Sequence, residues 1–166
     1  MLRAATRLPV SDYLSQKVWI PAGMEADASW WLESPDGLEV GGSGVSAVLR
    51  DYARFGLFML EDGVAGGRHI LPEYWMADAA SPKQVGNERI EYGYMLWPLR
   101  DAAYSAIGIF GQFVYVNPAR QVVVAMWSAQ PKPVDRAGLD EYDFLAALAK
   151  AVHNFYSGKP AERFPH

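Results

Sequence analysis

The chain has 166 residues, of which 51% are hydrophobic and 20% are charged, a composition typical of one globular domain rather than a disordered chain. Its formal net charge is −4 and it has no basic cluster, which argues against a nucleic acid partner because phosphate binding needs a concentrated lysine and arginine face. The absence of cysteine excludes disulfides, thiolate catalysis and cysteine-ligated zinc.

No segment of the chain has the composition of a membrane anchor or a leader. The longest apolar runs fall short of the roughly 20 residues that span a bilayer. The first residues carry two positive charges but no apolar core behind them, so they make a poor signal peptide. We therefore expect a cytoplasmic protein without membrane contact.

We predict that residues 1–166 form a single domain. Residues 1–90 of this domain are expected to be mainly helix and loop. Leu8-Pro9 stops a first short helix, because proline lacks the amide hydrogen that a helix interior needs. Ser11-Asp12 is then predicted to cap a second short helix that continues to about Trp19.

Residues 25–44 have the turn residues of a loop, and a tryptophan pair lies within it, Trp30-Trp31. We interpret the pair as a buried cap on the core, with a wall of a ligand site as the alternative. Residues 45–62 form the clearest predicted helix, because their apolar residues repeat at intervals of three and four. Gly63 is expected to end this helix.

Three antiparallel strands are predicted within residues 91–130, where β-branched and aromatic residues are frequent. A short helix starting at residues 71–73 and a loop over 81–87 precede them. The strands are expected at 92–97, 111–116 and 121–127. The residues Asn117-Pro-Ala-Arg120 are expected to join the last two strands as a hairpin.

A final amphipathic helix is predicted at residues 139–158. Asp140 is expected to cap its N-terminus, and Gly158 to end it. Helices, then three antiparallel strands, then one helix indicate the α+β fold class.

The chain lacks the common serine nucleophile motifs. No serine is followed three residues later by a lysine, the spacing that places both on one helix face so that the amine can accept the hydroxyl proton. Ser43 in Gly41-Gly-Ser-Gly-Val45 fails the last position of a nucleophile elbow, so we interpret it as a loop residue. Tyr115-Val-Asn117 matches Tyr-x-Asn, but its position at a strand end is typical of a turn.

The remaining titratable residues suggest no metal site and no cofactor. His69, His153 and His166 do not share ligand spacing. The acidic residues fall in loops or at the predicted start of the last helix, where carboxylates favour exposed N–H groups. A Ser-His-Asp triad assembled from distant residues stays open, although no pattern favours one.

Three segments together resemble the serine hydrolases of the class C β-lactamase, penicillin-binding protein and nylon-oligomer hydrolase superfamily. They read DYLSQKVWIPAGM (12–24), GGSGVSAVLRDYARFG (41–56) and GIFGQ (108–112), and their order and spacing are more specific than any one of them. The resemblance implies a β-lactamase/transpeptidase-like fold and acyl transfer through an acyl-serine on an ester, amide or β-lactam. It further implies that Ser-x-x-Lys and the family's Tyr-x-Asn precede the aligned segment.

The resemblance also implies which residues would face a substrate. The strand around GIFGQ borders the active-site cleft in that superfamily, where backbone groups help to hold the substrate carbonyl. Tyr92-Gly-Tyr94 matches the family's Tyr-Gly-x, although half-buried strand tyrosines are the commoner case. No Lys or His followed by Thr or Ser precedes the glycines here, which weakens a β-lactam substrate more than an ester or amide. The predicted substrate-binding residues are Gly108, Ile109, Phe110, Gly111, Gln112, Tyr92 and Tyr94.

A chain that supplies only the later strands of such a sheet would expose one edge. In the resembled family an N-terminal hairpin pairs with the strand that corresponds to residues 121–127, and a further helix carries the nucleophile. Without them the apolar strand 121–127 is a bare edge, and such edges pair with another chain. We therefore expect a homo-oligomer, formed sheet to sheet across a two-fold axis.

The leading hypothesis is the C-terminal part of a serine hydrolase that is inactive alone, or one half of a split enzyme. The second is a non-catalytic module that binds a small molecule or a protein through an aromatic surface. The residues of that surface would be Trp30, Trp31, Tyr92, Tyr94 and Trp97. A third is an independent enzyme whose site no motif identifies.

Overall fold

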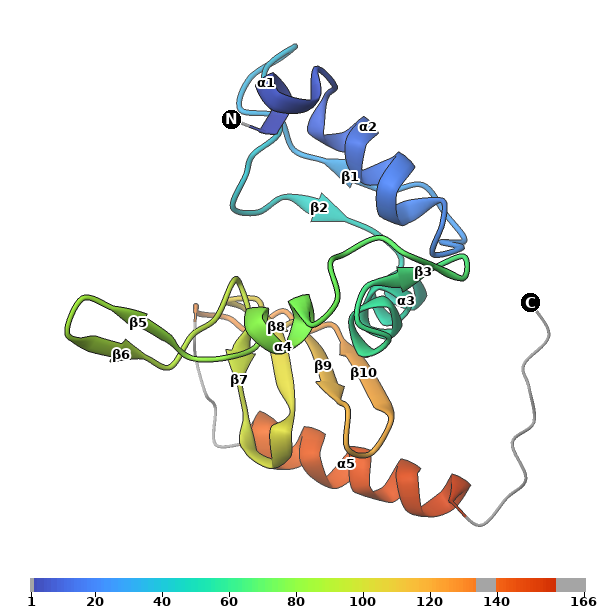
Figure 1. Cartoon of the computed structure of the whole chain (residues 1–166), viewed down its shortest axis with the longest axis vertical. Helices are drawn as coiled ribbons and strands as arrows, with labels where there is room; N and C mark the ends of the chain where they lie inside the picture. Colours follow the sequence, from blue (N-terminus) through green and yellow to red (C-terminus); the bar gives the residue numbers. More distant parts are fainter. Residues whose placement is uncertain (1, 134–139, 158–166) are drawn as a thin grey trace.

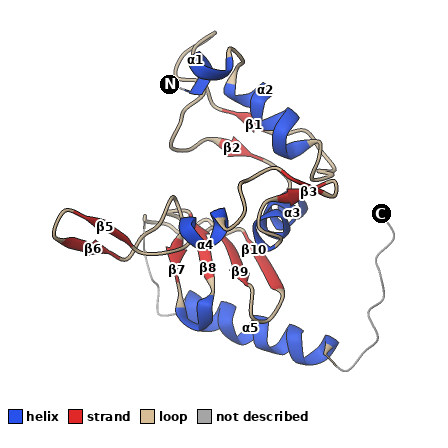
Figure 2. Ribbon diagram, viewed as in Figure 1, coloured by secondary structure: helices blue, strands red, loops and turns tan. Residues whose placement is uncertain are grey.

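The computed structural model describes residues 2–133 and 140–157, which form an α+β fold of short helices and antiparallel strands (Figures 1 and 2). None of the helices in these ranges is long and apolar enough to cross a membrane. A π-helical turn at Ser15–Trp19 and a 3₁₀ turn at Arg100–Ala102 supplement the labelled elements. In chain order these elements are α1 (Leu2–Thr6), α2 (Val10–Leu14), β1 (Ser29–Trp30), β2 (Val45–Ser46), α3 (Leu49–Leu60), β3 (Val64–Ala65), β4 (Arg68–His69), α4 (Trp75–Ala79), β5 (Lys83–Val85), β6 (Glu88–Ile90), β7 (Trp97–Pro98), β8 (Tyr104–Ile107), β9 (Phe113–Asn117), β10 (Val122–Met126) and α5 (Glu141–Tyr156).

The central sheet has four antiparallel strands in the order β10-β9-β8-β7. Figure 1 shows α5 across one face and α3 with α4 on the other. Because both faces are covered, all five residues of β9 are buried although their side chains alternate between the faces. The predicted hairpin between β9 and β10 is confirmed by a register that pairs Val122 with Asn117 and Met126 with Phe113.

Two apolar clusters fill the space on either side of this sheet. The cluster on the α3 and α4 face contains Met59, Met76, Ala79, Leu96, Tyr104, Val114 and Val116. The cluster on the α5 face contains Ala103, Phe113, Tyr115, Val122, Leu145 and Ala149. The sheet is therefore the middle layer of a helix–sheet–helix sandwich.

Helix α5 follows the sequence prediction at its N-terminus. The Asp140 carboxylate accepts hydrogen bonds from the backbone N–H groups of Tyr142 (3.0 Å) and Asp143 (3.2 Å), which confirms the predicted cap. Leu145 and Ala149, one helical turn apart, are fully buried against the sheet. The helix runs to Tyr156, and the predicted end at Gly158 lies outside the described residues.

Helix α3 starts later than predicted, at Leu49, because Val45–Ser46 pairs with Ser29–Trp30 as a small two-stranded sheet. The tertiary pairing of this segment outweighs its helical periodicity. Gly63 closes the helix as predicted: it has φ +77° and its N–H donates to the Phe58 carbonyl (2.8 Å).

The N-terminal helices begin differently from the prediction. The residue before α2 is Pro9, and Ser11 is not a cap. Instead, the backbone N–H and the hydroxyl of Ser11 both donate to Glu39 Oε1, at 2.9 and 2.8 Å. Residues 15–19 continue the helix as a π-turn. A distant carboxylate thus occupies the groups that a local cap would have used.

Several predicted boundaries in residues 71–107 are wrong. The helix expected at residues 71–73 begins at Trp75, and the loop expected at 81–87 contains half of the hairpin β5–β6. The strand expected at residues 92–97 is shorter and later than predicted, since β7 contains only Trp97–Pro98. The strand β8 was not predicted. The sheet consequently has four strands rather than three.

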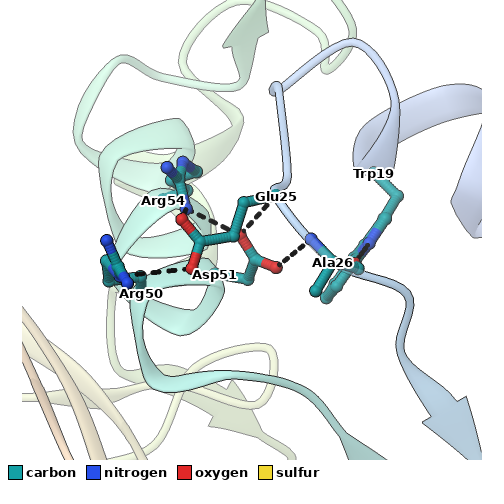
Figure 3. A network of polar contacts seen from close by, with 6 residues as sticks. All are labelled: Trp19, Glu25, Ala26, Arg50, Asp51 and Arg54. Atoms are coloured by element: carbon teal, nitrogen blue, oxygen red, sulfur yellow. Dashed lines mark hydrogen bonds and ion pairs between the residues drawn. The ribbon is translucent and has the colours of Figure 1, made fainter.

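A network of polar contacts joins residues 19–26 to α3, as Figure 3 shows. Asp51 is fully buried and accepts hydrogen bonds from the backbone N–H groups of Glu25 (2.9 Å) and Ala26 (3.1 Å). Arg54 lies 2.8 Å from Asp51 Oδ1 and 3.1 Å from Glu25 Oε2. The Trp19 indole N–H donates to the Ala26 carbonyl (2.8 Å). A buried charge with several partners is costly to disrupt, so this network anchors the segment.

Candidate functional site

The glycine-rich segment 108–112 is a turn between β8 and β9, not part of a strand as predicted. The Gly108 N–H donates to the Gln112 carbonyl (2.8 Å), and the Gly111 N–H donates to the Gly108 carbonyl (3.1 Å). Gly111 has φ +82°, a conformation that favours glycine. Ile109 and Phe110 at the tip remain exposed, by 57% and 38%. Residues 108–112 therefore form a tight turn at the end of β8, with two exposed apolar side chains at its tip.

Two glutamines brace this turn. Gln112 Oε1 accepts from the Phe110 N–H (3.2 Å) and its Nε2 donates to the Ser128 carbonyl (3.2 Å). Gln130 holds the same turn through its backbone N–H, which donates to the Phe110 carbonyl (3.1 Å). The Gln130 amide also donates to Glu141 Oε1 (2.7 Å), which ties the turn to the first residue of α5. Gln112 is therefore a positioning residue of the turn.

The glycines of this turn have packed surroundings. A Cβ at Gly111 would lie 2.7 Å from Gln130 Nε2, and a Cβ at Gly108 would collide with the Gln112 side chain. Substitution of either glycine would displace the glutamines that brace the turn.

The two tyrosines predicted beside the turn have different environments. Tyr92 is half-buried, and its ring centroid lies 4.6 Å from that of Trp97. Tyr94 is 51% exposed, but its ring stacks on Trp75 (5.7 Å) and the Lys83 ammonium lies 4.1 Å from its centroid. The ring contacts of Tyr94 are therefore intramolecular.

The β7–β8 register places these aromatic residues near the turn. Trp97 pairs with Ser105, two residues before the end of β8 at Ile107. Since the strands are antiparallel, the residues before Trp97 lie toward the end of the sheet where the turn 108–112 leaves β8. Trp97 is 43% exposed and forms, with Tyr92, the aromatic side of this end of the sheet. We call Tyr92, Trp97 and residues 108–112 the sheet-end site.

The tryptophan pair at residues 30 and 31 does not belong to the sheet-end site. Figure 1 shows β1 in the N-terminal part of the molecule, away from β7. Trp30 is half-buried, and its indole N–H donates to the carbonyl of Val40 (2.9 Å). Trp31 is 69% exposed. The interpretation of the pair as a buried cap is wrong for Trp31, and the five aromatic residues do not form one surface.

The hydroxyl groups and histidines of the described residues form no catalytic grouping around the sheet-end site. Ser105 is fully buried and donates to the carbonyls of Ala106 (2.9 Å) and Val114 (3.0 Å). The Tyr115 hydroxyl is buried on the α5 face and accepts from the Asn117 amide (3.1 Å). His153 Nδ1 lies 2.9 Å from the Arg120 carbonyl. Tyr115-x-Asn117 thus has a packing role.

The buried phenol of Tyr104 makes a structural contact. Burial raises the pKa of the Tyr104 phenol, whose hydroxyl donates to the Met59 carbonyl (3.0 Å). In residues 2–133 and 140–157 no three histidine, aspartate or glutamate side chains are grouped as metal ligands. The described contacts of residues 108–112 are therefore those of a fixed turn with exposed apolar side chains.

Two hollows lie away from the sheet-end site. One of about 360 Å³ lies between the 3₁₀ turn and the start of α5, and one of about 310 Å³ lies between α2 and β1. Neither is lined by a lysine or a histidine, so neither offers the usual base for a serine nucleophile.

Comparisons with known proteins agree with this picture of a partial hydrolase fold. The chain is 26% identical over 148 residues to a 6-aminohexanoate-dimer hydrolase of Paenarthrobacter ureafaciens, which covers 82% of this chain and 38% of the relative. A solved structure from Bacillus anthracis, provisionally assigned as a 6-aminohexanoate-dimer hydrolase, superposes with a TM-score of 0.74 at 23% identity, covering 96% of this chain and 42% of the other. A β-lactamase from Mycobacterium bovis superposes with a TM-score of 0.64 at 16% identity, covering 91% of this chain and 59% of the other.

The chain thus spans less than half the length of both hydrolase relatives. At these identities the two solved structures establish the fold. A family model described as Beta-lactamase matches residues 1–148. The chain belongs to the Beta-lactamase family, and the matched residues include the central sheet and the glycine-rich turn after β8.

Proposed function

We propose that this chain supplies the substrate-facing sheet end of a serine hydrolase that transfers an acyl group from an ester or amide, and that it is inactive alone. The braced turn at residues 108–112 is the observation that carries the proposal, because a fixed turn with exposed apolar residues suits a substrate wall. Membership of the Beta-lactamase family supports the reaction class. The names of two relatives, which refer to hydrolysis of an aminohexanoate dimer, support an amide.

In this proposal the residues of the sheet-end site have separate roles. The turn of residues 108–111 lies beside the substrate carbonyl. The N–H groups of Gly108, Phe110 and Gly111 hold the turn itself, so the Ile109 N–H is the group that would stabilise a developing oxyanion. Ile109 and Phe110 contact apolar parts of the substrate, and Tyr92 with Trp97 forms the aromatic wall. Tyr94 is 51% exposed and contacts the substrate with the part of its side chain that Trp75 and Lys83 leave open. Gln112 positions the turn.

The nucleophile is expected to come from a separate polypeptide or from sequence beyond the aligned segment. In the Ser-x-x-Lys arrangement, the lysine one helical turn away accepts the proton of the serine. No Ser-x-x-Lys occurs in the 166 residues. A β-lactam is the less favoured substrate, because no Lys or His stands directly before Gly108 to pair with its carboxylate.

The first experiment is to incubate the purified chain with a fluorophosphonate probe and a chromogenic short-chain ester, and to measure the intact mass. We expect neither an adduct nor turnover. A stoichiometric adduct with turnover would contradict the proposal and favour an independent enzyme with its own serine.

The second experiment supplies the missing part. The segment of the Paenarthrobacter ureafaciens relative that precedes the aligned 148 residues would be co-expressed with this chain, and ester and amide hydrolysis measured. We expect turnover only in the mixture, and none when the serine of the added segment is replaced by alanine. Gln112→Ala is expected to lower the rate about tenfold by releasing the turn, whereas Gln84→Ala, in the exposed hairpin β5–β6, leaves it unchanged. Equal rates for the two variants would remove residues 108–112 from the site.

A second candidate function is a non-catalytic binding module that uses the same apolar surface. The exposure of Trp97, Ile109 and Phe110 favours it. A chain that binds an amide such as the aminohexanoate dimer with Trp97-dependent affinity, yet stays inactive in every mixture, would support this candidate.

A further inference from the structure

The N–H of Ile109 points out of the turn because the peptide unit that contains it is fixed. The Gly108 carbonyl, in the same trans peptide unit, accepts from the Gly111 N–H (3.1 Å) inside the turn. The carbonyl and the N–H of a trans peptide point in opposite directions, so the Ile109 N–H is directed away from the turn. Within the part of the chain that the structure describes, this N–H donates to no carbonyl or side chain. Its direction depends on the contacts that hold residues 108–111.

Gln130 contacts the turn with its backbone and with its side chain. Its N–H donates to the Phe110 carbonyl (3.1 Å), and its Nε2 would lie 2.7 Å from a Cβ at Gly111. Because Gly111 is buried and has no side chain, the glutamine amide fills the space beside it. The Gly111 N–H is the donor that holds the Gly108 carbonyl, so displacement of Gln130 would release the peptide unit of Ile109.

Glu141 holds the Gln130 side chain from helix α5. Its Oε1 accepts from Gln130 Nε2 at 2.7 Å, and a hydrogen bond to a carboxylate is stronger than one between neutral groups. Glu141 is the first residue of α5, whose Leu145 and Ala149 are fully buried against the sheet. The helix is therefore a rigid support, and the carboxylate fixes the glutamine at a point that the core determines.

The start of α5 does not need the pair of Glu141 and Gln130 for its own attachment. Asp140 caps the helix, and the Tyr142 ring meets Phe113 edge to face at 6.0 Å. The hydrogen bond between Glu141 and Gln130 is instead the contact through which the helix reaches residues 108–112. Its loss should disturb the turn more than the helix.

We propose, on the basis of the function proposed above, that Glu141 and Gln130 are positioning residues that set the direction of the Ile109 N–H without contacting the substrate. A donor displaced by about 1 Å stabilises an oxyanion much less than a donor in place. The oxyanion develops only in the transition state, so loss of either residue should lower kcat and change KM little.

Amide hydrogen exchange of the chain alone tests the coupling. Gln130→Glu places two carboxylates together, so the Phe110 and Gly111 amides are expected to exchange about tenfold faster than in the wild type. Q130E/E141Q reverses the direction of the hydrogen bond and is expected to restore slow exchange. Asp143→Asn removes a 72% exposed carboxylate from the same turn of α5 and should leave both amides unchanged. Circular dichroism and the protection of β9 show that each variant is folded.

Kinetics test the role in the reaction, in the mixture of this chain with the preceding segment of the Paenarthrobacter ureafaciens relative. Glu141→Ala is expected to lower kcat about tenfold and to change KM by less than about twofold. Glu141→Gln keeps an oxygen that accepts from Gln130 and should retain most of the rate, and Asp143→Asn should retain all of it.

The two measurements separate this inference from the proposed function. Unchanged exchange in Gln130→Glu, or faster exchange with an unchanged kcat in Glu141→Ala, would overturn the positioning role in a mixture that still turns over. A wild-type mixture without turnover would contradict the proposed function, and the positioning role with it, whatever the exchange rates are.

Discussion

Residues 2–48 and the sheet with its covering helices are held together by different interactions. None of residues 2–48 is buried, whereas all five residues of β9 are. The sheet region has an apolar cluster on each face. The N-terminal region is instead fastened by hydrogen bonds, from Ser11 to Glu39, from Trp19 to Ala26, and from Glu25 and Ala26 to Asp51.

This difference indicates which part of the molecule folds on its own. Apolar burial is the main driving force of folding, and the sheet region contains nearly all of it. A region with few buried apolar contacts opens with a smaller free energy than the core. We therefore expect two levels of stability, with residues 2–48 the weaker and α3 the element that joins the two.

The largest expected effect is on the sheet. Leu145→Ala removes a fully buried side chain from the α5 cluster and should lower the free energy of unfolding by about 4 kcal/mol. Phe144→Ala is the control, since Phe144 is 54% exposed on the same helix, and should change stability by less than about 1 kcal/mol. Urea unfolding followed by circular dichroism measures both. Equal losses would mean that α5 does not pack as described.

Asp51→Ala should separate the two regions. It leaves Arg54 and two backbone N–H groups without their buried partner, at a cost of about 3 kcal/mol. Hydrogen exchange should rise in residues 10–30 while β9 stays protected. Arg50→Ala is the control, because Arg50 is 81% exposed and its ion pair with Glu25 contributes little. Loss of protection in β9 as well would show that the two regions unfold together.

Gly56→Ala tests how closely α3 approaches the sheet. A Cβ at Gly56 would collide with the Val123 side chain and lie 3.0 Å from Val114 Cγ1. Overpacking should cost about 2 kcal/mol, and the better helix propensity of alanine should return about 1 kcal/mol. Val123→Ala in the same chain should relieve the collision, whereas Gly41→Ala, with no atom within 4 Å of the added Cβ, should not change the packing. Thermal unfolding compares the four proteins.

Much of the fold was predictable where local signals and tertiary packing agree. Asp140 at the start of α5, Gly63 after α3 and the hairpin at Asn117 to Arg120 have the residue types that their backbone positions require. Each of these features depends on contacts within a few residues, so a single sequence contains the information.

The secondary-structure predictions fail where contacts between residues far apart in the sequence determine the structure. Val45–Ser46 fits a helical period but pairs with β1, and Ser11 resembles a cap but binds Glu39, 28 residues away. Tyr104–Ile107 has strand-favouring residues only at its two ends, and becomes a strand because β7 and β9 flank it.

The same reason limits the candidate site. Residues 108–112 were assigned to a strand although they form a turn, and the contacts of Gln112 and Gln130 with Ser128 and Glu141 join residues that no local pattern connects. The stacking of Trp75 on Tyr94 likewise joins α4 to the segment before β7.

The smallest expected effect is the pH dependence of the N-terminal region. The Ser11 backbone N–H, together with the Ser11 hydroxyl, lowers the pKa of Glu39 from 4.5 to about 2. Because the folded-state pKa lies below the unfolded value, this contact stabilises the region above pH 4.5 and is lost as the pH falls from 4.5 toward 2.

The amide proton shift of Ser11 should therefore titrate with a midpoint near 2. Glu39→Gln should abolish this titration, whereas Glu33→Gln, at an exposed carboxylate, should not alter it. A midpoint near 4.5 in the wild type would mean that Ser11 does not hold Glu39. The polar contacts that fasten residues 2–48 would then stabilise this region even less, relative to the sheet, than the hydrogen bonds indicate.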